Sequence, residues 1–156
     1  MAQARPDNAG VHVPPPLIYF AAFAGGALLR RTVPLPIGGG LARVILAWAL
    51  AAASVGLAAS GVISFWRRHT SVVPIQPATT LVVAGPYRFT RNPMYVGLAL
   101  LTAATGLWLN TWWVFVLLVP AVLATDRFVI AREEAYLRRR FGAEYEVYTR
   151  RVRRWL

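Results

Sequence analysis

The sequence predicts an all-α, polytopic membrane bundle of about four transmembrane helices with a cytoplasmic C-terminal amphipathic helix, all in one domain over residues 1–156. Three observations lead to this prediction. The hydrophobic fraction of 57% and the positive mean hydropathy are high for a soluble globule. The apolar residues come in blocks that approach the length of a bilayer crossing, separated by proline and glycine. The 17 basic residues, all arginine, lie mostly at the ends of these blocks and in the tail, where lipid headgroups would meet them.

The composition also restricts the function. A net charge of +11 raises nucleic acid as a partner, but arginines placed at the ends of apolar blocks argue against nucleic-acid binding. The absence of cysteine excludes disulfides, thiolate metal sites and cysteine nucleophiles, and we predict no metal site. The glycine-rich phosphate loops, the zinc-protease motif and the nucleophile elbow are also absent from the sequence, so the usual catalytic motifs of soluble enzymes do not apply.

The first part of the chain is interpreted as a polar start followed by two apolar spans. Residues 1–13 are polar, and residues 14–66 hold both spans. The apolar block 17–29 reaches the roughly 20 residues of a full crossing only if its helix includes the preceding prolines and carries the following two arginines into the headgroups. Gly25 and Gly26 inside this block would let another helix approach closely.

The rest of the chain divides into a span, a loop, a helical hairpin and a basic tail. The block 41–66 is the clearest span, and it leads into a proline-rich cytoplasmic loop over residues 67–92, which we expect to be extended rather than paired in a sheet. Residues 93–130 form two antiparallel helices joined by a tight turn. Residues 131–156 form an amphipathic basic tail that is broken at Gly142.

The positions of the arginines set the orientation. The hairpin turn at Asn110 and Thr111 carries no arginine, so the positive-inside rule places the loop and the tail together on the cytoplasmic side. Arg30, Arg31 and Arg43 then fall on the opposite side of a four-helix protein. A shorter first segment that does not span would relieve this conflict. We keep the prediction of four spans, a multi-pass integral membrane protein with its catalytic face in the cytoplasm.

Two polar clusters are expected to meet at that cytoplasmic face. Pro93 suits the first turn of a helix and Asn92 can cap that helix, which leaves amide protons and the positive end of the helix dipole facing an anionic group. Because the hairpin helices are antiparallel, the start of the first and the end of the second lie at the same surface. The side chains gathered there are Tyr87, Arg88, Arg91, Asn92 and Tyr95, with Asp126, Arg127, Arg132, Glu133 and Glu134.

Such a site suits a ligand that bears a carboxylate, a positive centre and vicinal hydroxyls. Arginines and helix-start amides take the carboxylate, aromatic faces tolerate the cation, and a glutamate accepts from the hydroxyls. S-adenosylmethionine has all three features. Each piece alone also has a structural interpretation, because arginines and tyrosines at helix ends often anchor a protein at the interface and an acidic pair beside arginines often belongs to a solvated face.

The polar stretches of the C-terminal half also carry a family resemblance. They read Gly85-Pro86-Tyr87-Arg88, Arg91-Asn92-Pro93-Met94-Tyr95-Val96-Gly97, Arg132-Glu133-Glu134 and Phe141-Gly142-Ala143-Glu144-Tyr145, followed by Tyr148. In order and spacing these stretches resemble the isoprenylcysteine carboxyl methyltransferase and phospholipid methyltransferase family of membrane enzymes. The N-terminal half is similar to that family only as apolar spans.

The resemblance implies an S-adenosylmethionine-dependent methyltransferase that acts on a lipophilic acceptor, either an isoprenylcysteine-type carboxylate or a phospholipid-type amine, by direct displacement. The cofactor would lie on the cytoplasmic side, and the acceptor would enter from the bilayer. The family usually has histidine where this chain has Asn92, and an amide cannot act as a base. The implied cofactor-binding residues are Tyr87, Arg91, Asn92, Pro93, Tyr95, Glu133 and Glu134.

The catalytic assignment depends on the acceptor. A carboxylate needs no general base, whereas an ammonium or alcohol must first lose a proton. We take Asp126 as the candidate base and Arg127 as the candidate for orienting an acceptor carboxylate, although the two could simply pair with each other. His69 is better explained as an interfacial residue.

The alternative is a non-catalytic small membrane scaffold or anionic-lipid-binding protein. It explains the charge and the spans without a cofactor, but it does not explain why Arg91-Asn92-Pro93 should lie opposite Glu133-Glu134. A transporter is disfavoured because no charged residue lies in the middle of a span. Anionic membrane lipids are expected partners of the basic tail. The choice between the two acceptors and the oligomeric state stay open.

Overall fold

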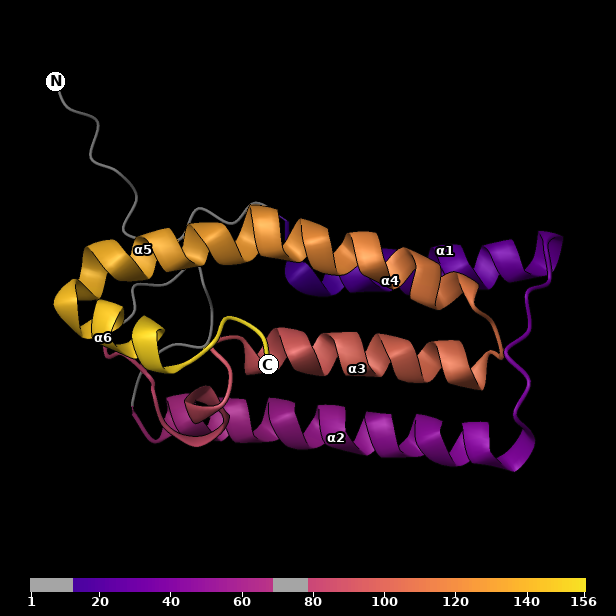
Figure 1. Cartoon of the computed structure of the whole chain (residues 1–156), viewed down its shortest axis with the longest axis horizontal. Helices are drawn as coiled ribbons and strands as arrows, with labels where there is room; N and C mark the ends of the chain where they lie inside the picture. Colours follow the sequence, from indigo (N-terminus) through magenta and orange to yellow (C-terminus); the bar gives the residue numbers. More distant parts are fainter. Residues whose placement is uncertain (1–12, 69–78) are drawn as a thin grey trace, which may run out of the picture.

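The computed structural model describes residues 13–68 and 79–156, and these residues form helices and loops without a strand. Four long helices run side by side, and the shorter helices gather with the last residues at one end (Figure 1). The expectations for residues 1–12 and for His69 lie outside the described residues. The helices are α1 (Pro15–Thr32), α2 (Gly40–Trp66), the 3-10 helix η1 (Gly85–Arg88), α3 (Pro93–Trp108), α4 (Trp113–Ala124), the π-helix η2 (Thr125–Ile130), α5 (Ala131–Phe141) and α6 (Ala143–Arg151).

The helix α1 includes prolines of the run 14–16, which the sequence analysis made a condition for a full crossing. It begins at Pro15, where a proline fits because the first helical N–H has no partner to lose, and it includes both arginines that close the apolar block. The helix packs against α4, and a Cβ on Gly26 would come within 2.6 to 2.9 Å of Val114 atoms, some of them backbone. The prediction that the glycine pair admits a neighbouring helix is confirmed.

Small residues also bring α2 and α3 together. The Ser54 hydroxyl on α2 donates to the carbonyl of Gly97 on α3 at 2.7 Å. A Cβ on Gly97 would lie 3.4 Å from the Ser54 carbonyl oxygen, so the helices are in close contact there. This use of small residues and a hydroxyl is typical of helix packing in membranes.

The hairpin after α3 is confirmed, but its second helix is longer than predicted. The backbone stays helical from Trp113 to Phe141, passing from α4 through the π-helix η2 into α5, whereas we expected a helix ending at Ile130 and a separate tail helix. The charges that begin at Asp126 coincide with a change from α-helical to π-helical hydrogen bonding, but the backbone stays helical, because no glycine or proline lies between Thr125 and Phe141 to stop it. The predicted break at Gly142 is confirmed, with φ +51°.

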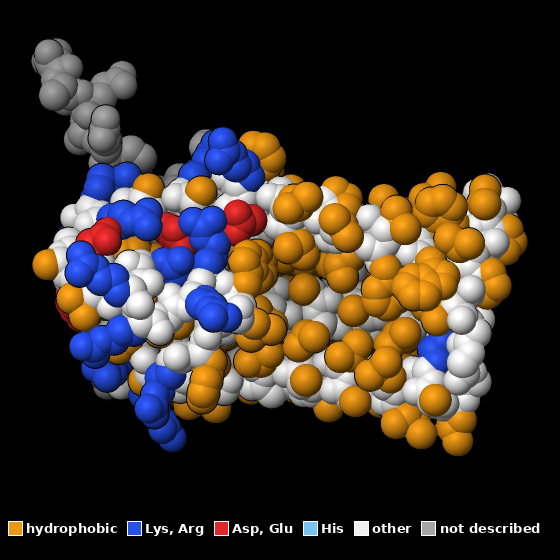
Figure 2. Space-filling model, in the orientation of Figure 1, with side chains coloured by type: hydrophobic (Ala, Val, Ile, Leu, Met, Phe, Trp, Pro, Cys, Tyr) orange, Lys and Arg blue, Asp and Glu red, His pale blue; other side chains and the backbone are white. Residues whose placement is uncertain are grey.

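Membrane association is supported by two helices of the described residues that are long and apolar enough to cross a bilayer. They are Gly40–Trp66 and the continuous helix Trp113–Phe141, while α3 is apolar but shorter. Apolar side chains cover most of the bundle, and charged side chains gather at one end (Figure 2). The helices are thus arranged as a four-helix bundle, and the number of crossings and the cytoplasmic side remain predictions.

The two ends of the bundle differ in chemistry, and we name them accordingly. The polar end comprises η1, residues 89–92, α5, α6 and residues 152–156. The turn end comprises residues 33–39 and 109–112, the two chain reversals at the opposite end (Figure 1).

The two chain reversals of the turn end are joined by uncharged hydrogen bonds. The N–H of Trp112 donates to the carbonyl of Leu35 at 3.0 Å, which joins one reversal to the other. The side-chain oxygen of Asn110 accepts from the N–H groups of Ile37 and Gly38 at 3.1 and 2.9 Å. Asn110 has φ +52°, a left-handed conformation that asparagine adopts more readily than most residues.

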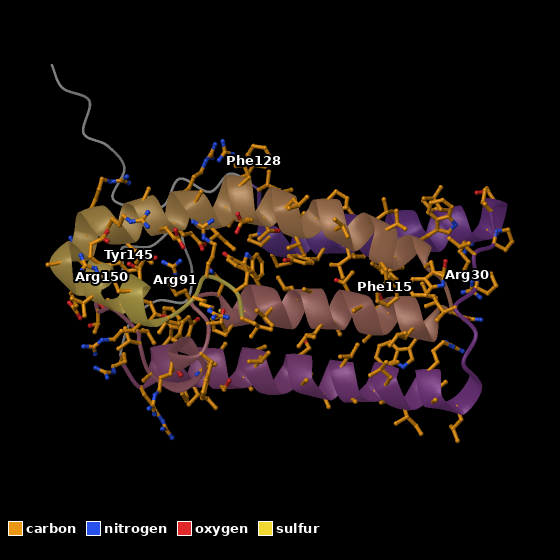
Figure 3. The ribbon with its side chains drawn as sticks, viewed as in Figure 1. Arg30, Arg91, Phe115, Phe128, Tyr145 and Arg150 are labelled. Carbon is orange, nitrogen blue, oxygen red and sulfur yellow. The ribbon has the colours of Figure 1, made fainter. Side chains whose placement is uncertain are left out.

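The position of one arginine at the turn end, Arg43, has a structural explanation. Arg43 donates to the carbonyls of Leu107 and Trp108 at the end of α3, where a cation also meets the negative end of the helix dipole. Arg30 lies at the same end of the bundle (Figure 3). The conflict with the positive-inside rule therefore persists, and at Arg43 the capping of α3 accounts for it.

Candidate active site

The loop before α3 is fastened to α6 at the polar end. Leu81 packs in a buried cluster with Tyr145, Tyr148 and Val152. The Tyr148 hydroxyl donates to the carbonyl of Tyr87 at 2.7 Å. Burial raises the pKa of Tyr145 and of Tyr148 above the usual tyrosine value, so both hydroxyls stay protonated at physiological pH. The loop is thereby held in place by residues more than fifty positions away in the chain.

The helix η1 rests on α2 and turns Tyr87 toward the bundle. Gly85 has φ +61°, and a Cβ there would lie 2.4 Å from the Ser64 hydroxyl, so the position requires glycine. The Tyr87 ring meets Phe65 edge-on, with centroids 5.5 Å apart. Tyr87 is buried, which raises the pKa of its hydroxyl. The predicted cofactor residue Tyr87 is therefore an interior side chain and not an exposed one.

Asn92 and Pro93 lie at the start of α3, as predicted, but Asn92 does not cap the helix with its side chain. Its amide Nδ2 donates instead to the carbonyl of Arg154 at 2.8 Å. The prediction of a side-chain cap is wrong because a carbonyl from residues 152–156, sixty-two positions on, takes the amide group.

Two further donors that precede α3 are also satisfied by residues 152–156, and a third is satisfied by Thr90. The Thr90 hydroxyl donates to the carbonyl of Arg154 at 3.2 Å, and the N–H of Arg91 donates to the carbonyl of Arg153 at 3.0 Å. The N–H of Asn92 donates to the Thr90 hydroxyl oxygen at 3.1 Å. The helix start thus offers a row of donors, as expected for an anion site, but main-chain carbonyls face that row.

Arg91 itself is a buried cation that has donors to spare. Its side chain is 12% exposed, and its Nη2 lies 3.2 Å from Oε1 of Glu134. The Tyr145 hydroxyl lies close enough to interact with the guanidinium, but Nε and Nη1 are buried and neither has a partner at hydrogen-bond geometry among the described residues. Buried arginine donors are normally paired, so the unpaired atoms mark a place where an anionic group would be stabilised.

Glu134 is the acidic centre of the site. Its side chain is 4% exposed, and Arg154 approaches its two carboxylate oxygens at 3.0 and 2.7 Å. Arg138 adds a more distant ion pair at 3.7 Å. A buried carboxylate is tolerated only when it is paired in this way, so Glu134 and its arginines depend on one another.

Glu133 points in a different direction from Glu134, since neighbouring residues of a helix are about 100° apart. The hydroxyl of Tyr95 on α3 donates to Oε1 of Glu133 at 2.6 Å. The acidic pair is thus divided: Glu134 faces guanidinium groups, and Glu133 faces a tyrosine of the bundle.

The predicted catalytic pair is also separated. Asp126 lies in the π-helix η2, a type of turn often found at functional sites. Its carboxylate accepts from Arg154 at 3.1 Å and from the Trp155 indole at 2.9 Å, whereas Arg127 is exposed. Asp126 therefore pairs with Arg154 and not with Arg127, which was the alternative left open by the sequence.

Sequence reasoning missed Arg154 and Trp155, which the structure places at the centre of the polar end. Both were interpreted as part of the basic tail that is expected to meet anionic lipids. Nothing in the sequence distinguishes Arg154 from Arg150, Arg151 or Arg153, because all lie in one basic run. The fold alone turns this guanidinium inward, toward Glu134 and Asp126.

The polar end is chemically suited to a ligand with both charges. Arg91 and Tyr145 lie together there, while Arg30 marks the opposite end (Figure 3). The site combines a buried guanidinium with two unpaired donors, a carboxylate held by a tyrosine, and two carboxylates held by arginine.

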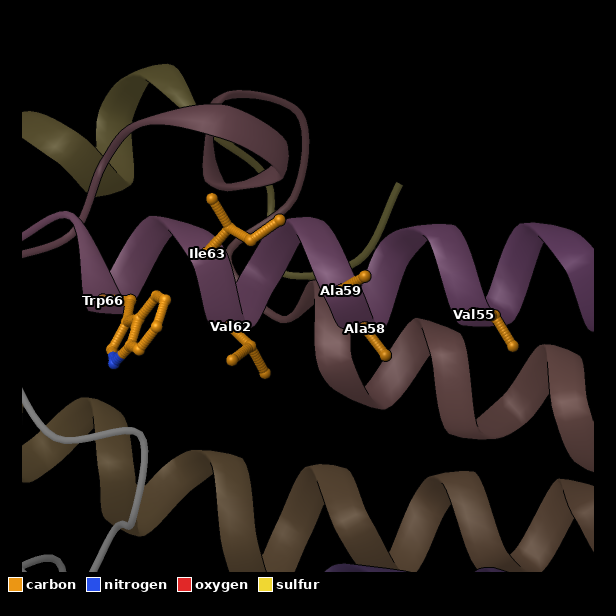
Figure 4. A pocket seen from close by; sticks show the side chains of 6 residues that line it. All are labelled: Val55, Ala58, Ala59, Val62, Ile63 and Trp66. Atoms are coloured by element: carbon orange, nitrogen blue, oxygen red, sulfur yellow. The ribbon is translucent and has the colours of Figure 1, made fainter.

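An open apolar surface formed by side chains of α2 runs along this helix toward the polar end. Val55, Ala58, Val62 and Trp66 project to one side of the helix there (Figure 4). This apolar surface reaches the last turn of α2, where Ser64 meets η1.

Comparison with known proteins identifies the family. Residues 42–144 match the phospholipid methyltransferase family, which is about two thirds of the chain. The chain belongs to this family. An uncharacterized protein of Haemophilus influenzae (strain ATCC 51907 / DSM 11121 / KW20 / Rd) is 43% identical over 63 residues, which make up 40% of this chain and all of that protein. No solved structure matches the chain.

Membership of the phospholipid methyltransferase family makes the protein a membrane methyltransferase. The matched range includes each residue predicted for the site, from Tyr87 to Glu134. It ends before Tyr145, so Tyr148, Arg154 and Trp155 enter the polar end from outside the matched range.

Proposed function

We propose that the protein is a multi-pass membrane enzyme that transfers a methyl group from S-adenosylmethionine to a lipophilic acceptor at the polar end, on the cytoplasmic face. The family supports methyl transfer. The observation that carries the site assignment is Arg91, whose buried guanidinium keeps two unpaired donors beside a buried carboxylate. A lipid-anchoring arginine would instead be exposed to headgroups.

The residues present fit this cofactor. Its carboxylate suits the Nε and Nη1 of Arg91, and its hydroxyl groups suit the Glu133 carboxylate that Tyr95 holds. Tyr87 adds an aromatic ring to the interior of the site. With Asn92, Pro93 and Glu134, these residues would hold the cofactor. When bound, the cofactor supplies a methyl group on a positively charged sulfur, open to attack by a nucleophile.

The chain's own residues have separate tasks in this proposal. Arg91 orients an anionic group, and the buried tyrosines keep water from the site. Asp126 remains the candidate base for an ammonium or alcohol acceptor, but it can take a proton only when Arg154 and Trp155 release it. Exposed Arg127 can meet an acceptor carboxylate or headgroup phosphate.

The acceptor is proposed to be an isoprenylcysteine-type carboxylate or a phospholipid-type amine. The apolar surface of α2 suits its hydrocarbon chain, because this surface lies on the outer face of the helix and runs to the polar end. The exposed arginines of α5 and α6 would sit among anionic headgroups.

The test is a transfer assay with methyl-labelled S-adenosylmethionine and the detergent-purified protein. Farnesylcysteine and phosphatidylethanolamine vesicles are offered in separate reactions, and label in the organic phase reports transfer. Mild alkali releases a methyl ester as methanol but leaves an N-methyl group, so it distinguishes the two chemistries.

Transfer that is lost in Arg91→Gln would support the proposal, with the exposed Arg139→Gln as the matched control. A folded protein that neither binds the cofactor nor transfers label to either acceptor would favour the scaffold alternative.

A further inference from the structure

Residues 152–156 lie across both the donors and the carboxylates of the candidate site. The carbonyls of Arg153 and Arg154 face the row of donors before α3, while the Arg154 guanidinium and the Trp155 indole face the carboxylates. Four residues of this segment follow Val152, which is buried against Leu81 and the α6 tyrosines. Val152 therefore anchors a short segment, called the arm below, that lies in the site.

The arm presents two kinds of group in a fixed arrangement. Its carbonyl oxygens accept from the Arg91 N–H at 3.0 Å, from Asn92 at 2.8 Å and from Thr90 at 3.2 Å. Its cation lies 2.7 Å from Glu134 and 3.1 Å from Asp126. Acceptor oxygens on one side and a cation on the other are also the features of a zwitterionic α-amino acid.

We propose that residues 153–156 occupy the subsite for the amino-acid end of the cofactor, and that they withdraw when the cofactor binds. This inference rests on the proposed function, because the amino-acid end belongs to S-adenosylmethionine and its product S-adenosylhomocysteine. The carboxylate of the ligand takes the donors that the arm carbonyls now occupy, and its ammonium takes the place of the Arg154 guanidinium.

Replacing the arm by the ligand is favoured at the Arg91 guanidinium. The arm leaves the Nε and Nη1 of Arg91 buried and without a partner among the described residues, whereas a ligand carboxylate can accept from them. Because Arg154 is one-third exposed, the cost of breaking its ion pairs is moderated by solvent. The arm thus acts as a weaker internal substitute for the ligand.

The hinge of the arm is defined by the backbone. Helix α6 ends at Arg151, and Val152 is extended with φ −123° and ψ 130°. Withdrawal therefore requires no unwinding of α6 and leaves the buried Val152 in place.

The chain contains no cysteine, so a spin label can be placed at one position. Leu156, 76% exposed, is replaced by cysteine, labelled, and titrated with S-adenosylhomocysteine while label mobility is recorded by electron paramagnetic resonance. Affinity is measured in parallel for a chain ending at Val152, for Arg154→Ala, and for Arg150→Ala as the control, because Arg150 is exposed on α6.

We expect saturable binding with a rise in label mobility. If the arm is withdrawn in about one molecule in ten, its removal tightens binding about tenfold, and Arg154→Ala tightens it by a smaller factor. Arg150→Ala is expected to bind as the wild type does.

Two results overturn the inference in different ways. Saturable binding with unchanged label mobility, and with equal or weaker affinity in the shortened chain, would overturn the arm exchange and leave the proposed function standing. An absence of binding in both the folded wild type and the folded shortened chain would overturn the proposed function and the inference with it.

Discussion

The two ends of the bundle satisfy their polar groups by different means. At the turn end, neutral groups join the chain reversals, as Asn110 does with two backbone N–H groups, and the cation Arg43 donates to backbone carbonyls. At the polar end, Glu134 is enclosed by three arginines, and one of them, Arg91, keeps unpaired donors. Arg43 at the turn end also keeps a buried Nε without a partner among the described residues, but only the polar end sets such donors beside a buried carboxylate. We therefore assign a stabilising role to the turn end and ligand binding to the polar end.

The largest effect is expected from removing Glu134. Glu134→Ala leaves the buried Arg91 guanidinium without its counter-ion, and breaking such a pair costs about 3 to 5 kcal/mol of unfolding free energy. Chemical unfolding in detergent micelles measures it. The control is Glu146→Ala, because Glu146 also pairs with an arginine but is half exposed, and its loss should cost less than about 1 kcal/mol. Equal losses for the two variants would contradict the special status of the polar end.

A smaller effect is expected where α1 and α4 touch. Gly26→Ala places a methyl group within 2.6 to 2.9 Å of Val114, and such overpacking costs about 1 to 3 kcal/mol. Gly56→Ala on α2 is the matched control, since nothing lies within 4 Å of a Cβ there. The unfolding midpoint should fall for Gly26→Ala and stay equal or rise for Gly56→Ala. The close α1–α4 contact would be refuted if both variants unfolded together with the wild type.

The smallest effect is expected at the turn end. Asn110→Ala removes the acceptor of two N–H groups that are partly solvated and strains the left-handed backbone, which together should cost about 1 to 2 kcal/mol. Asn110→Asp keeps an acceptor and should recover most of that loss. Neither variant should alter cofactor affinity in a calorimetric titration. A large fall in affinity with little loss of stability would show that the two ends are coupled.

Local signals account for the parts of the fold that could be predicted. Proline at the start of α1 and α3, the tight turn after α3, the small residues of α1 and the break at Gly142 all act within a few residues. The continuity of α4 into α5 was missed because the change from apolar to charged residues resembles a boundary, although nothing there stops a helix.

For the site, the sequence predicted which kinds of side chain lie near one another but not which groups they pair with. The antiparallel hairpin brings Tyr95 near Glu133, as the sequence indicated. The partners of Asn92 and Asp126 are contributed by Arg154, 62 and 28 residues away, and no periodicity distinguishes this arginine from its neighbours. Long-range pairing of that kind is decided by the packing of α5 and α6 and not by local sequence.

The most direct test of the account is a calorimetric titration of the purified protein with S-adenosylhomocysteine, beside Arg91→Lys. Lysine keeps a positive charge near Glu134 but cannot supply the donors of the guanidinium fork. We predict saturable binding by the wild type and binding at least about tenfold weaker by the variant, a loss of about 1.4 kcal/mol or more. Equal affinity in the two folded proteins, or no binding by either, would contradict the claim that Arg91 receives the cofactor.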